Sequence, residues 1–237
     1  MADTKTSRKR DRSTASTTVA NPDSGSNKMF TLVIIAILVL GLAGIAIVAT
    51  SREGVDLDGD QTAPIEIEGE FLTQMTSSGI SADPSTDPVI GVQMPTVTGT
   101  DFSDNEIVIG ADGRAKAVYF LAHWCPHCQA ELPRIVELIE TGRQPADLDI
   151  YAISTSVDAS RGGAYPPVRW FDQEGFTAPV IRDSADNEAF LHFGGGGYPY
   201  AIYVDADNNI VARSSGELQP QAIEAMWLTA AGSAAAG

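Results

Sequence analysis

The sequence predicts an α/β domain with a central mixed β-sheet flanked by helices, and an apolar segment ahead of it that is long enough to cross a membrane. Short apolar runs alternate with helical patterns in the second half of the chain, which favours a strand–helix–strand opening. Two further apolar runs flank the turn Asp207-Asn208-Asn209 and predict an antiparallel hairpin. Such a unit, followed by a hairpin and a last helix, gives a sheet with both parallel and antiparallel pairs.

The expected strands are short runs rich in apolar residues. Continuous runs such as AVYFLA and DIYAIS are typical of strands that are buried on both faces. Upstream of the domain, Ile65–Glu68 alternates apolar with acidic residues and predicts one more short strand. Within the domain the predicted strands are Ile107–Ile109, Ala117–Ala122, Asp149–Ser154, Ala178–Arg182, Tyr200–Asp205 and Ile210–Ser214.

The first helix is expected to begin at Cys125-Pro126 and to run to about Glu140, because apolar residues recur along it at helical spacing. Pro126 suits the first helical position, where a missing N–H costs nothing. Pro133 lies in the middle of the predicted helix and is expected to kink it. The later helices are expected at Val168–Glu174, Ser184–Phe193 and Gln219–Leu228.

The segment 29–49 (MFTLVIIAILVLGLAGIAIVA) carries no charge and is long enough to span a bilayer core as one helix. A cleaved signal peptide is the alternative, but the run is longer than the usual apolar region of about 7–15 residues. Basic residues precede the segment and acidic ones follow it. This asymmetry predicts a single-pass cell-membrane protein with its N-terminus in the cytoplasm and its C-terminal domain outside, where disulfides persist.

We expect five regions along the chain. They are a disordered basic cytoplasmic tail (1–28), a transmembrane helix (29–49), an acidic flexible linker (50–88), the folded domain (89–232) and a disordered tail (233–237). The first region holds six basic and three acidic residues, so nine of the 15 basic and 28 of the 31 acidic residues belong to the rest. A surface this acidic does not suit nucleic acid, which is itself negatively charged.

The tetrapeptide Cys125-Pro126-His127-Cys128 contains both cysteines of the chain. Thiols spaced i, i+3 at a helix start can close a disulfide across one turn. There, the free N–H groups and the helix dipole favour a thiolate on the first cysteine. A structural disulfide usually joins distant segments, and this loop is too short for that. The pattern therefore predicts a redox-active pair, with a metal site as the alternative.

The chain resembles a thioredoxin fold, in particular the membrane-tethered TlpA/ResA-like thiol–disulfide oxidoreductases. The resemblance covers roughly Val89–Ala231. It rests on YFLAHWCPHC at Tyr119–Cys128, Glu131-Leu132-Pro133, and YPYAIYVD at Tyr198–Asp205. The dipeptide Pro126-His127 differs from that of thioredoxin and is similar to the pair in DsbA-type oxidases.

This resemblance implies an enzyme that exchanges disulfides with protein substrates and with a membrane or extracytoplasmic redox partner. The dithiol itself is the redox group, so no cofactor and no metal are expected. Cys125 is expected to be the exposed nucleophile and Cys128 the buried resolving thiol, with Pro126 at the helix start. His127 is expected to stabilise the Cys125 thiolate and so to favour oxidation of clients.

Substrate binding is expected at Trp124, Tyr198 and Pro199. The resemblance implies a cis Pro199 that faces the dithiol, with the Tyr198 carbonyl beside it as an edge for an extended peptide; an ordinary strand entry at Pro199 is the alternative. Gly194–Gly197 is expected to form a flexible hinge ahead of it. His192 is expected on the helix surface or in the core, away from the site.

One departure from thioredoxin concerns the position six before Cys125, which holds Tyr119 in place of a buried aspartate. A carboxylate there aids proton transfer to the second cysteine, so its absence favours oxidation or isomerisation unless Glu131 or Glu188 substitutes.

A copper- or zinc-binding chaperone on the same fold is the alternative function. Together with the two cysteines, His123 and His127 form a ligand set that suits Cu(I) or Zn(II). Such close spacing rarely closes a tetrahedron alone, and a solvent-facing His123 at the rim of the site is the simpler expectation.

Overall fold

The computed structural model describes residues 60–232, so the predicted tails, the membrane helix and the first part of the linker lie outside the described residues. The central sheet has six strands in the order β2-β9-β8-β5-β6-β7. β5 pairs in parallel with β6 and antiparallel with β8, which confirms a mixed sheet. Its strands are β2 (Gly79–Ser81), β5 (Ala115–Leu121), β6 (Leu148–Ser154), β7 (Val180–Arg182), β8 (Tyr200–Val204) and β9 (Ile210–Ser215).

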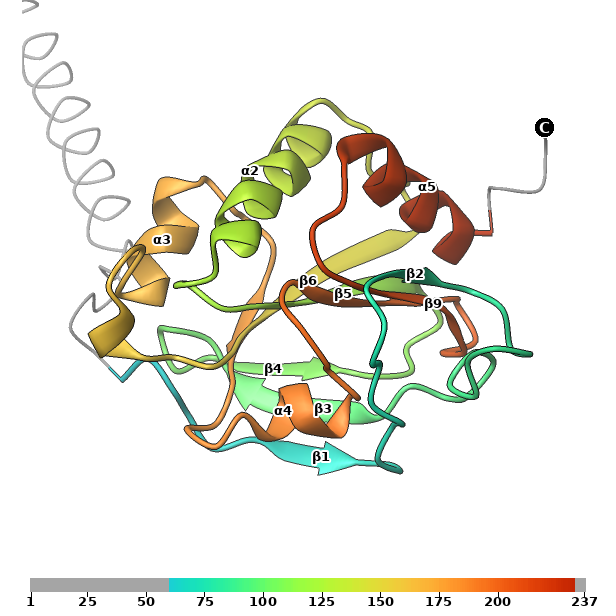
Figure 1. Cartoon of the computed structure of the whole chain (residues 1–237), viewed down its shortest axis with the longest axis horizontal. Coiled ribbons are helices and arrows are strands. Elements are labelled where there is room, and N and C mark those ends of the chain that lie inside the picture. The colour runs from blue at the N-terminus through green and yellow to red at the C-terminus, as the bar shows by residue number, and fades with distance from the viewer. Residues whose placement is uncertain (1–59, 233–237) are drawn as a thin grey trace, which may run out of the picture. The chain divides into compact units, whose positions relative to one another are not determined.

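A second, three-stranded sheet has the order β1-β3-β4. Its strands are β1 (Glu66–Glu68), β3 (Thr96–Thr100) and β4 (Glu106–Ile109). Helices α2 (Pro126–Glu140) and α5 (Pro220–Ala230) cover one face of the central sheet, whereas α4 (Glu188–His192) and the small sheet lie on the other (Figure 1). The remaining helices within residues 60–232 are α3 (Pro167–Gln173) and the short 3-10 helix η1 (Ala159–Arg161). This is a thioredoxin-like α/β fold.

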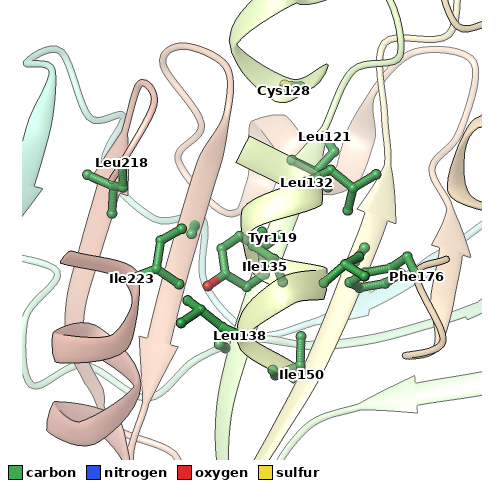
Figure 2. Packing of buried hydrophobic residues seen from close by; sticks show 14 of the residues in the cluster. Tyr119, Leu121, Cys128, Leu132, Ile135, Leu138, Ile150, Phe176, Leu218 and Ile223 are labelled. Atoms are coloured by element: carbon green, nitrogen blue, oxygen red, sulfur yellow. The ribbon is translucent and has the colours of Figure 1, made fainter. Parts of the chain in front are cut away.

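Strand β5 is buried on both faces, as predicted. Because side chains alternate along a strand, Tyr119 and Leu121 enter the core under α2, whereas Val118 and Phe120 enter the core on the opposite face. Figure 2 shows Tyr119 beneath α2, beside Ile135. Helix α2 spans the predicted residues, begins with Pro126 and is continuous through Pro133.

Residues 60–88 are part of the folded unit, so the predicted flexible linker at 50–88 is wrong for this part. They contribute β1 and β2, of which β2 pairs with β9 at the sheet edge. Asp87 forms a buried ion pair with Arg213 of β9, with oxygen–nitrogen distances of 2.6 and 2.7 Å. This ion pair holds residues 60–88 against β9, because either charge left buried without the other would strongly destabilise the fold.

Two further predictions are corrected. The helix expected over Ser184–Phe193 shortens to α4, because Asn187 adopts a left-handed backbone with φ 60°, which an α-helix cannot include. The glycines at 194–197 are tightly packed, so they do not form the expected hinge. A Cβ atom on Gly196 would lie 1.7 Å from the Met75 carbonyl oxygen, and one on Gly195 would lie 2.2 Å from the Phe190 ring.

No helix within residues 60–232 is long and apolar enough to span a membrane.

Candidate active site: a dithiol at the start of helix α2

The dithiol lies where the chain leaves β5 and enters α2. The Cys125 N–H donates to the Ala122 carbonyl over 3.0 Å, and Cys125 then caps the helix with an extended backbone. Pro126 follows as the first helical residue, and Cys128 lies one turn further. Both cysteines are free thiols in this structure.

The two thiols differ in accessibility less than the sequence predicts. Cys128 is fully buried, with 0% of its surface exposed, and Cys125 retains only 7%. The expectation of an exposed Cys125 is therefore wrong, although Cys125 is still the more accessible thiol. It belongs to the core cluster beneath α2, and Tyr198 packs against that cluster.

The start of β8 forms the other side of the dithiol. The Tyr198–Pro199 peptide bond is cis, as the resemblance implies. The Cys125 thiol points at the Tyr198 carbonyl oxygen, with 3.8 Å between the sulfur and the oxygen. The expected proximity of this carbonyl to the dithiol is thus confirmed.

The pKa values of the two thiols move in opposite directions. A hydrogen bond from the Cys128 thiol, assisted by the backbone N–H groups of Cys128 and His127, lowers the pKa of Cys125 to about 6. Burial raises the pKa of the Cys128 thiol far above its ordinary value. Near neutral pH, Cys125 is therefore largely a thiolate and Cys128 a thiol.

His127 is one of several groups that lower the pKa of Cys125. Its ring is exposed, and Nδ1 lies 2.9 Å from an Oε atom of Glu217, a hydrogen bond that raises the pKa of His127. The resulting positive charge helps to lower the pKa of Cys125, but its effect is smaller than that of the Cys128 hydrogen bond and of the backbone N–H groups. Glu217 also pairs with Arg134 at 2.5 Å, so its charge is shared between two partners.

A carboxyl group is present beneath the dithiol, on α2. Glu131 is buried, and its desolvation raises its pKa to about 7, with the Cys125 thiolate adding to the shift. One of its oxygens accepts a hydrogen bond from the Leu218 N–H. Glu188 is exposed on α4, so of the two predicted substitutes for the missing aspartate only Glu131 is near the thiols.

Trp124 is half-buried beside the dithiol. Its Nε1 donates to the Ser156 carbonyl over 2.6 Å, and its ring meets the Tyr198 ring edge to face at 5.6 Å. His123, expected to face solvent, is instead buried. Its Nε2 accepts the Asp158 N–H over 3.2 Å, because the loop after β6 folds over it. Desolvation lowers the pKa of His123, so the ring is neutral.

A family model described as Redoxin matches residues 90–226, which is more than half of the chain. The chain belongs to the Redoxin family. This membership confirms the thioredoxin-like resemblance and the predicted class of enzyme, a thiol–disulfide oxidoreductase. No curated protein matches the chain in sequence.

Solved structures resemble the Redoxin domain in fold. A candidate thiol:disulfide interchange protein DsbE from Chlorobium tepidum aligns with a TM-score of 0.50 and 15% identity, over 60% of this chain and 96% of its own. A thiol:disulfide interchange protein of the thioredoxin family from Chlorobium tepidum TLS aligns with a TM-score of 0.49 and 21% identity, over 59% and 96%.

The metal-site alternative has no geometric support in the Redoxin domain. Within residues 60–232, no three His, Cys, Asp or Glu side chains lie close enough together to hold a metal ion. His123 accepts the Asp158 N–H through one ring nitrogen, and His127 is bonded to Glu217. The two histidines of the motif therefore have other partners.

Sequence reasoning missed three residues around the dithiol of the Redoxin domain: Ser156, Arg161 and Glu217. Ser156 and Arg161 belong to the loop after β6, and both contact Trp124. Glu217 follows β9 and reaches His127 across 90 positions. No local motif marks these residues. The only signal was their position at the strand ends, which gather at the same sheet edge as the dithiol.

Proposed function

We propose that this chain is a membrane-tethered, extracytoplasmic oxidoreductase that exchanges disulfides with protein clients through Cys125-Pro126-His127-Cys128. The observation that carries the proposal is the asymmetry of the dithiol. The more accessible thiol has a pKa of about 6, and the buried thiol beside it has a raised pKa. An acidic attacking thiol and a protonated resolving thiol are the two parts that stepwise exchange requires.

In the reductive direction, the Cys125 thiolate attacks one sulfur of a client disulfide. The client's other sulfur leaves as a thiolate and takes a proton, and a mixed disulfide joins Cys125 to the client. Cys128 then loses its proton and attacks the Cys125 sulfur, which releases the second client thiol. Two electrons pass to the client together with one proton from Cys128 and one from solvent, and Cys125 and Cys128 end as a disulfide. Oxidation of a client dithiol is the reverse sequence.

Glu131 is the proposed acceptor for the proton of Cys128, because the two groups influence each other electrostatically. The negative charge of Cys125 contributes to the raised pKa of Cys128. That charge disappears when Cys125 enters the mixed disulfide, so the Cys128 thiol becomes more acidic at the moment it must react. A buried carboxyl group with a pKa of about 7 exchanges protons readily near neutral pH.

The location of the Tyr198 carbonyl beside Cys125 supports a role for this group in positioning the client. It lies at the end of a backbone segment that approaches the Cys125 sulfur within 3.8 Å. A client chain laid against this edge in an extended conformation places its own sulfur next to Cys125. Trp124 forms an aromatic wall beside the same edge, because its ring packs on Tyr198.

The thiol pKa bears on the direction of exchange. A value of about 6 for Cys125 lies between those of thioredoxin, about 7, and DsbA, about 3.5. A stabilised thiolate favours the reduced form and makes the disulfide a stronger oxidant. We therefore expect a reduction potential between about −270 mV and about −120 mV, the values of thioredoxin and DsbA.

The tether and the compartment rest on the sequence. The uncharged segment 29–49, with basic residues before it and acidic ones after it, supports a single membrane helix and a domain outside the cytosol. A membrane-impermeant maleimide applied to intact cells tests the compartment. Labelling of Cys125 before lysis supports the proposal, and labelling only after lysis refutes the location.

The activity is tested by the reduction potential of the full chain in detergent, measured in glutathione buffers with thiol trapping. A single two-electron transition between the two reference values, absent from a Cys125→Ser variant, supports disulfide exchange. The same protein should form a trapped mixed disulfide with a client peptide when Cys128 is replaced by Ala. Failure of both tests would rule out the proposed function.

A further inference from the structure

Arg161 lies over the aromatic wall of the dithiol site. Its guanidinium carbon is 3.3 Å from the centroid of the Trp124 ring, so the charged group stacks on the ring face. Stacking uses the flat face of a guanidinium and leaves the N–H groups on its edge available. Arg161 is exposed, and among residues 60–232 its side chain has neither an ion pair nor a hydrogen bond.

The loop that carries Arg161 is attached to the dithiol motif. The Ser156 carbonyl accepts the Trp124 Nε1–H over 2.6 Å, and the Asp158 N–H donates to His123 over 3.2 Å. Asp158 also caps η1, because its carboxylate accepts the N–H of Ser160 at 2.9 Å. Arg161 therefore has a defined position relative to Cys125.

Three contacts in series connect Arg161 to the reactive sulfur. Tyr198 brings its carbonyl to 3.8 Å from the sulfur of Cys125 and its ring to 5.6 Å from that of Trp124. The guanidinium group of Arg161 in turn stacks on the Trp124 ring. An extended chain advances about 3.3 Å per residue. A client held against Tyr198 therefore passes Arg161 within about three residues of its own cysteine.

The surrounding charges make Arg161 distinctive. The chain carries a formal net charge of −16, and its basic residues outside the first 28 are few. On the other side of the dithiol, Glu217 is bonded to both His127 and Arg134. Asp158 influences Arg161 electrostatically, but its carboxylate is bonded to Ser160. Arg161 is thus a cation at the rim of the site whose hydrogen-bond donors have no partner among residues 60–232.

We propose that Arg161 is a specificity-determining residue that binds a carboxylate of the client polypeptide close to the client's reactive cysteine. The proposal rests on the proposed function and adds to it the chemistry of the client: a cysteine with an Asp or Glu within about three residues. A planar guanidinium suits such a group because it donates two parallel hydrogen bonds to one carboxylate.

The test uses the reduced full chain in detergent and three capped peptides, each with a single cysteine. The peptides are identical except at the position two residues from the cysteine, which is Asp, Asn or Lys. Each peptide is supplied as its mixed disulfide with 2-mercaptoethanol, which is uncharged, and the rate of exchange is followed by mass spectrometry of quenched samples. The protein variants are Arg161→Ala, Arg161→Glu and, as a control, Arg169→Ala. Arg169 is also exposed, and among the described residues it has no ion pair.

In the wild type and in the Arg169→Ala control, the Asp peptide should react about two- to fivefold faster than the Asn peptide at low salt, the range of an exposed ion pair. Arg161→Ala should bring this ratio to about one, and Arg161→Glu should favour the Lys peptide. The ratio should also fall in high salt. The disulfide of 2-mercaptoethanol itself should react equally fast with the wild type and with Arg161→Ala.

The outcomes separate the two proposals. An Asp preference that survives in Arg161→Ala, or its absence in a wild type that exchanges with all three peptides, overturns the role of Arg161 alone. No exchange with any peptide or with the small disulfide, in a folded wild-type protein, overturns the proposed function.

Discussion

The Cys125 sulfur lies 3.8 Å from the Tyr198 carbonyl oxygen, although 73 positions separate the two residues. The sheet explains this proximity. β5 and β8 run antiparallel, with Phe120 opposite Tyr200, so the end of β5 and the beginning of β8 lie at the same edge. Cys125 follows β5 and Tyr198 precedes β8. The register of the core therefore sets the distance between the reactive thiol and the backbone edge proposed to hold the client.

The origin of the low thiol pKa can be tested by comparing two variants. Cys128→Ala removes the hydrogen bond that contributes most to the low pKa of Cys125, so this pKa should rise clearly above about 6. His127→Ser removes only the charge of an exposed ring and should raise it less. The pH dependence of alkylation by iodoacetamide gives both values. A larger rise in His127→Ser would place the main stabilisation on the histidine.

The link between His127 and Glu217 gives a second prediction. Glu217→Gln removes the carboxylate that raises the pKa of His127, so this pKa should fall towards its ordinary value of about 6.5. Because a neutral imidazole no longer stabilises the thiolate, the pKa of Cys125 should rise slightly. NMR titration of the histidine ring measures the first change. An unaltered histidine titration would mean that the 2.9 Å contact does not persist in solution.

Replacing Glu131 by Gln should affect both catalysis and stability. Without the carboxylate, release of the client from the mixed disulfide should slow by about 10²–10⁴-fold, and the inflection near pH 7 should disappear from its pH profile. The buried neutral form of Glu131 binds a proton that the unfolded chain releases above about pH 4.5, so this residue lowers stability as the pH rises towards 7.

The stability effect is measurable by urea unfolding of the reduced protein. At pH 8 the Glu131→Gln variant should be more stable than the wild type by up to about 3 kcal/mol, and the difference should shrink at pH 5. The Gln side chain can still accept the Leu218 N–H, so the loop before α5 should stay in place. A variant that is equally destabilised at both pH values would indicate a packing role instead.

The Asp87–Arg213 pair gives a prediction about folding. Asp87→Asn leaves the Arg213 charge buried without its partner and should destabilise the protein by about 3–5 kcal/mol. The exposed pair of Arg114 with Asp149 serves as a control, because Arg114→Ala should cost at most about 1 kcal/mol. Equal losses in the two variants would contradict the importance of burial.

The same pair has a pH signature. Burial alone would raise the pKa of Asp87, but hydrogen bonds, chiefly from Arg213, outweigh it and lower the pKa. A lowered carboxyl pKa contributes stability that is present above the unfolded value of about 3.9 and lost as the pH falls through the folded value. Asp87→Asn should therefore lose most of its disadvantage in strong acid, as measured by urea unfolding across this range.

Two glycines with similar backbone angles test the packing of the segment before Pro199. Gly194 has φ +75° and an added Cβ would lie 2.7 Å from the Thr73 carbonyl oxygen, whereas Gly113 has φ +83° and open space. Both alanine variants carry the backbone strain of a positive φ. Gly194→Ala should cost about 1–3 kcal/mol more, because it must also displace residues 72–75. Equal costs would restore the idea of a flexible hinge.

Local patterns were sufficient to predict much of this fold. The buried strand β5 and the helix α2 follow from a continuous apolar run and from a proline at a helix start. Strands β2 and β3 were missed because GIS and TVTGT carry glycine and polar residues, and only pairing with β9 and β4 makes them strands. The prediction of a flexible linker failed for the same reason, since the structural role of Asp87 depends on its ion pair with Arg213, which is distant in the sequence.

The site divides in the same way. The order of the thiols, the cis Pro199 and the Tyr198 carbonyl followed from the motif and the resemblance. The burial of Cys125 and His123 did not, because it depends on the loop after β6 and on β8, which return to α2 from distant parts of the sequence. Arg161 and Glu217 lie near the dithiol only because distant parts of the chain fold back towards α2.

The fastening of residues 60–88 determines where the chain can be shortened. A fragment cut at Val89 would remove Asp87 and the Thr73 carbonyl, two of the groups that hold the Arg213 side chain, and would expose an edge of β9. It would also remove Gln61, whose side chain accepts the Val168 N–H at the start of α3. A soluble fragment for redox measurements should therefore begin before Asp60, since a shorter one would report on a weakened sheet as well as on its thiols.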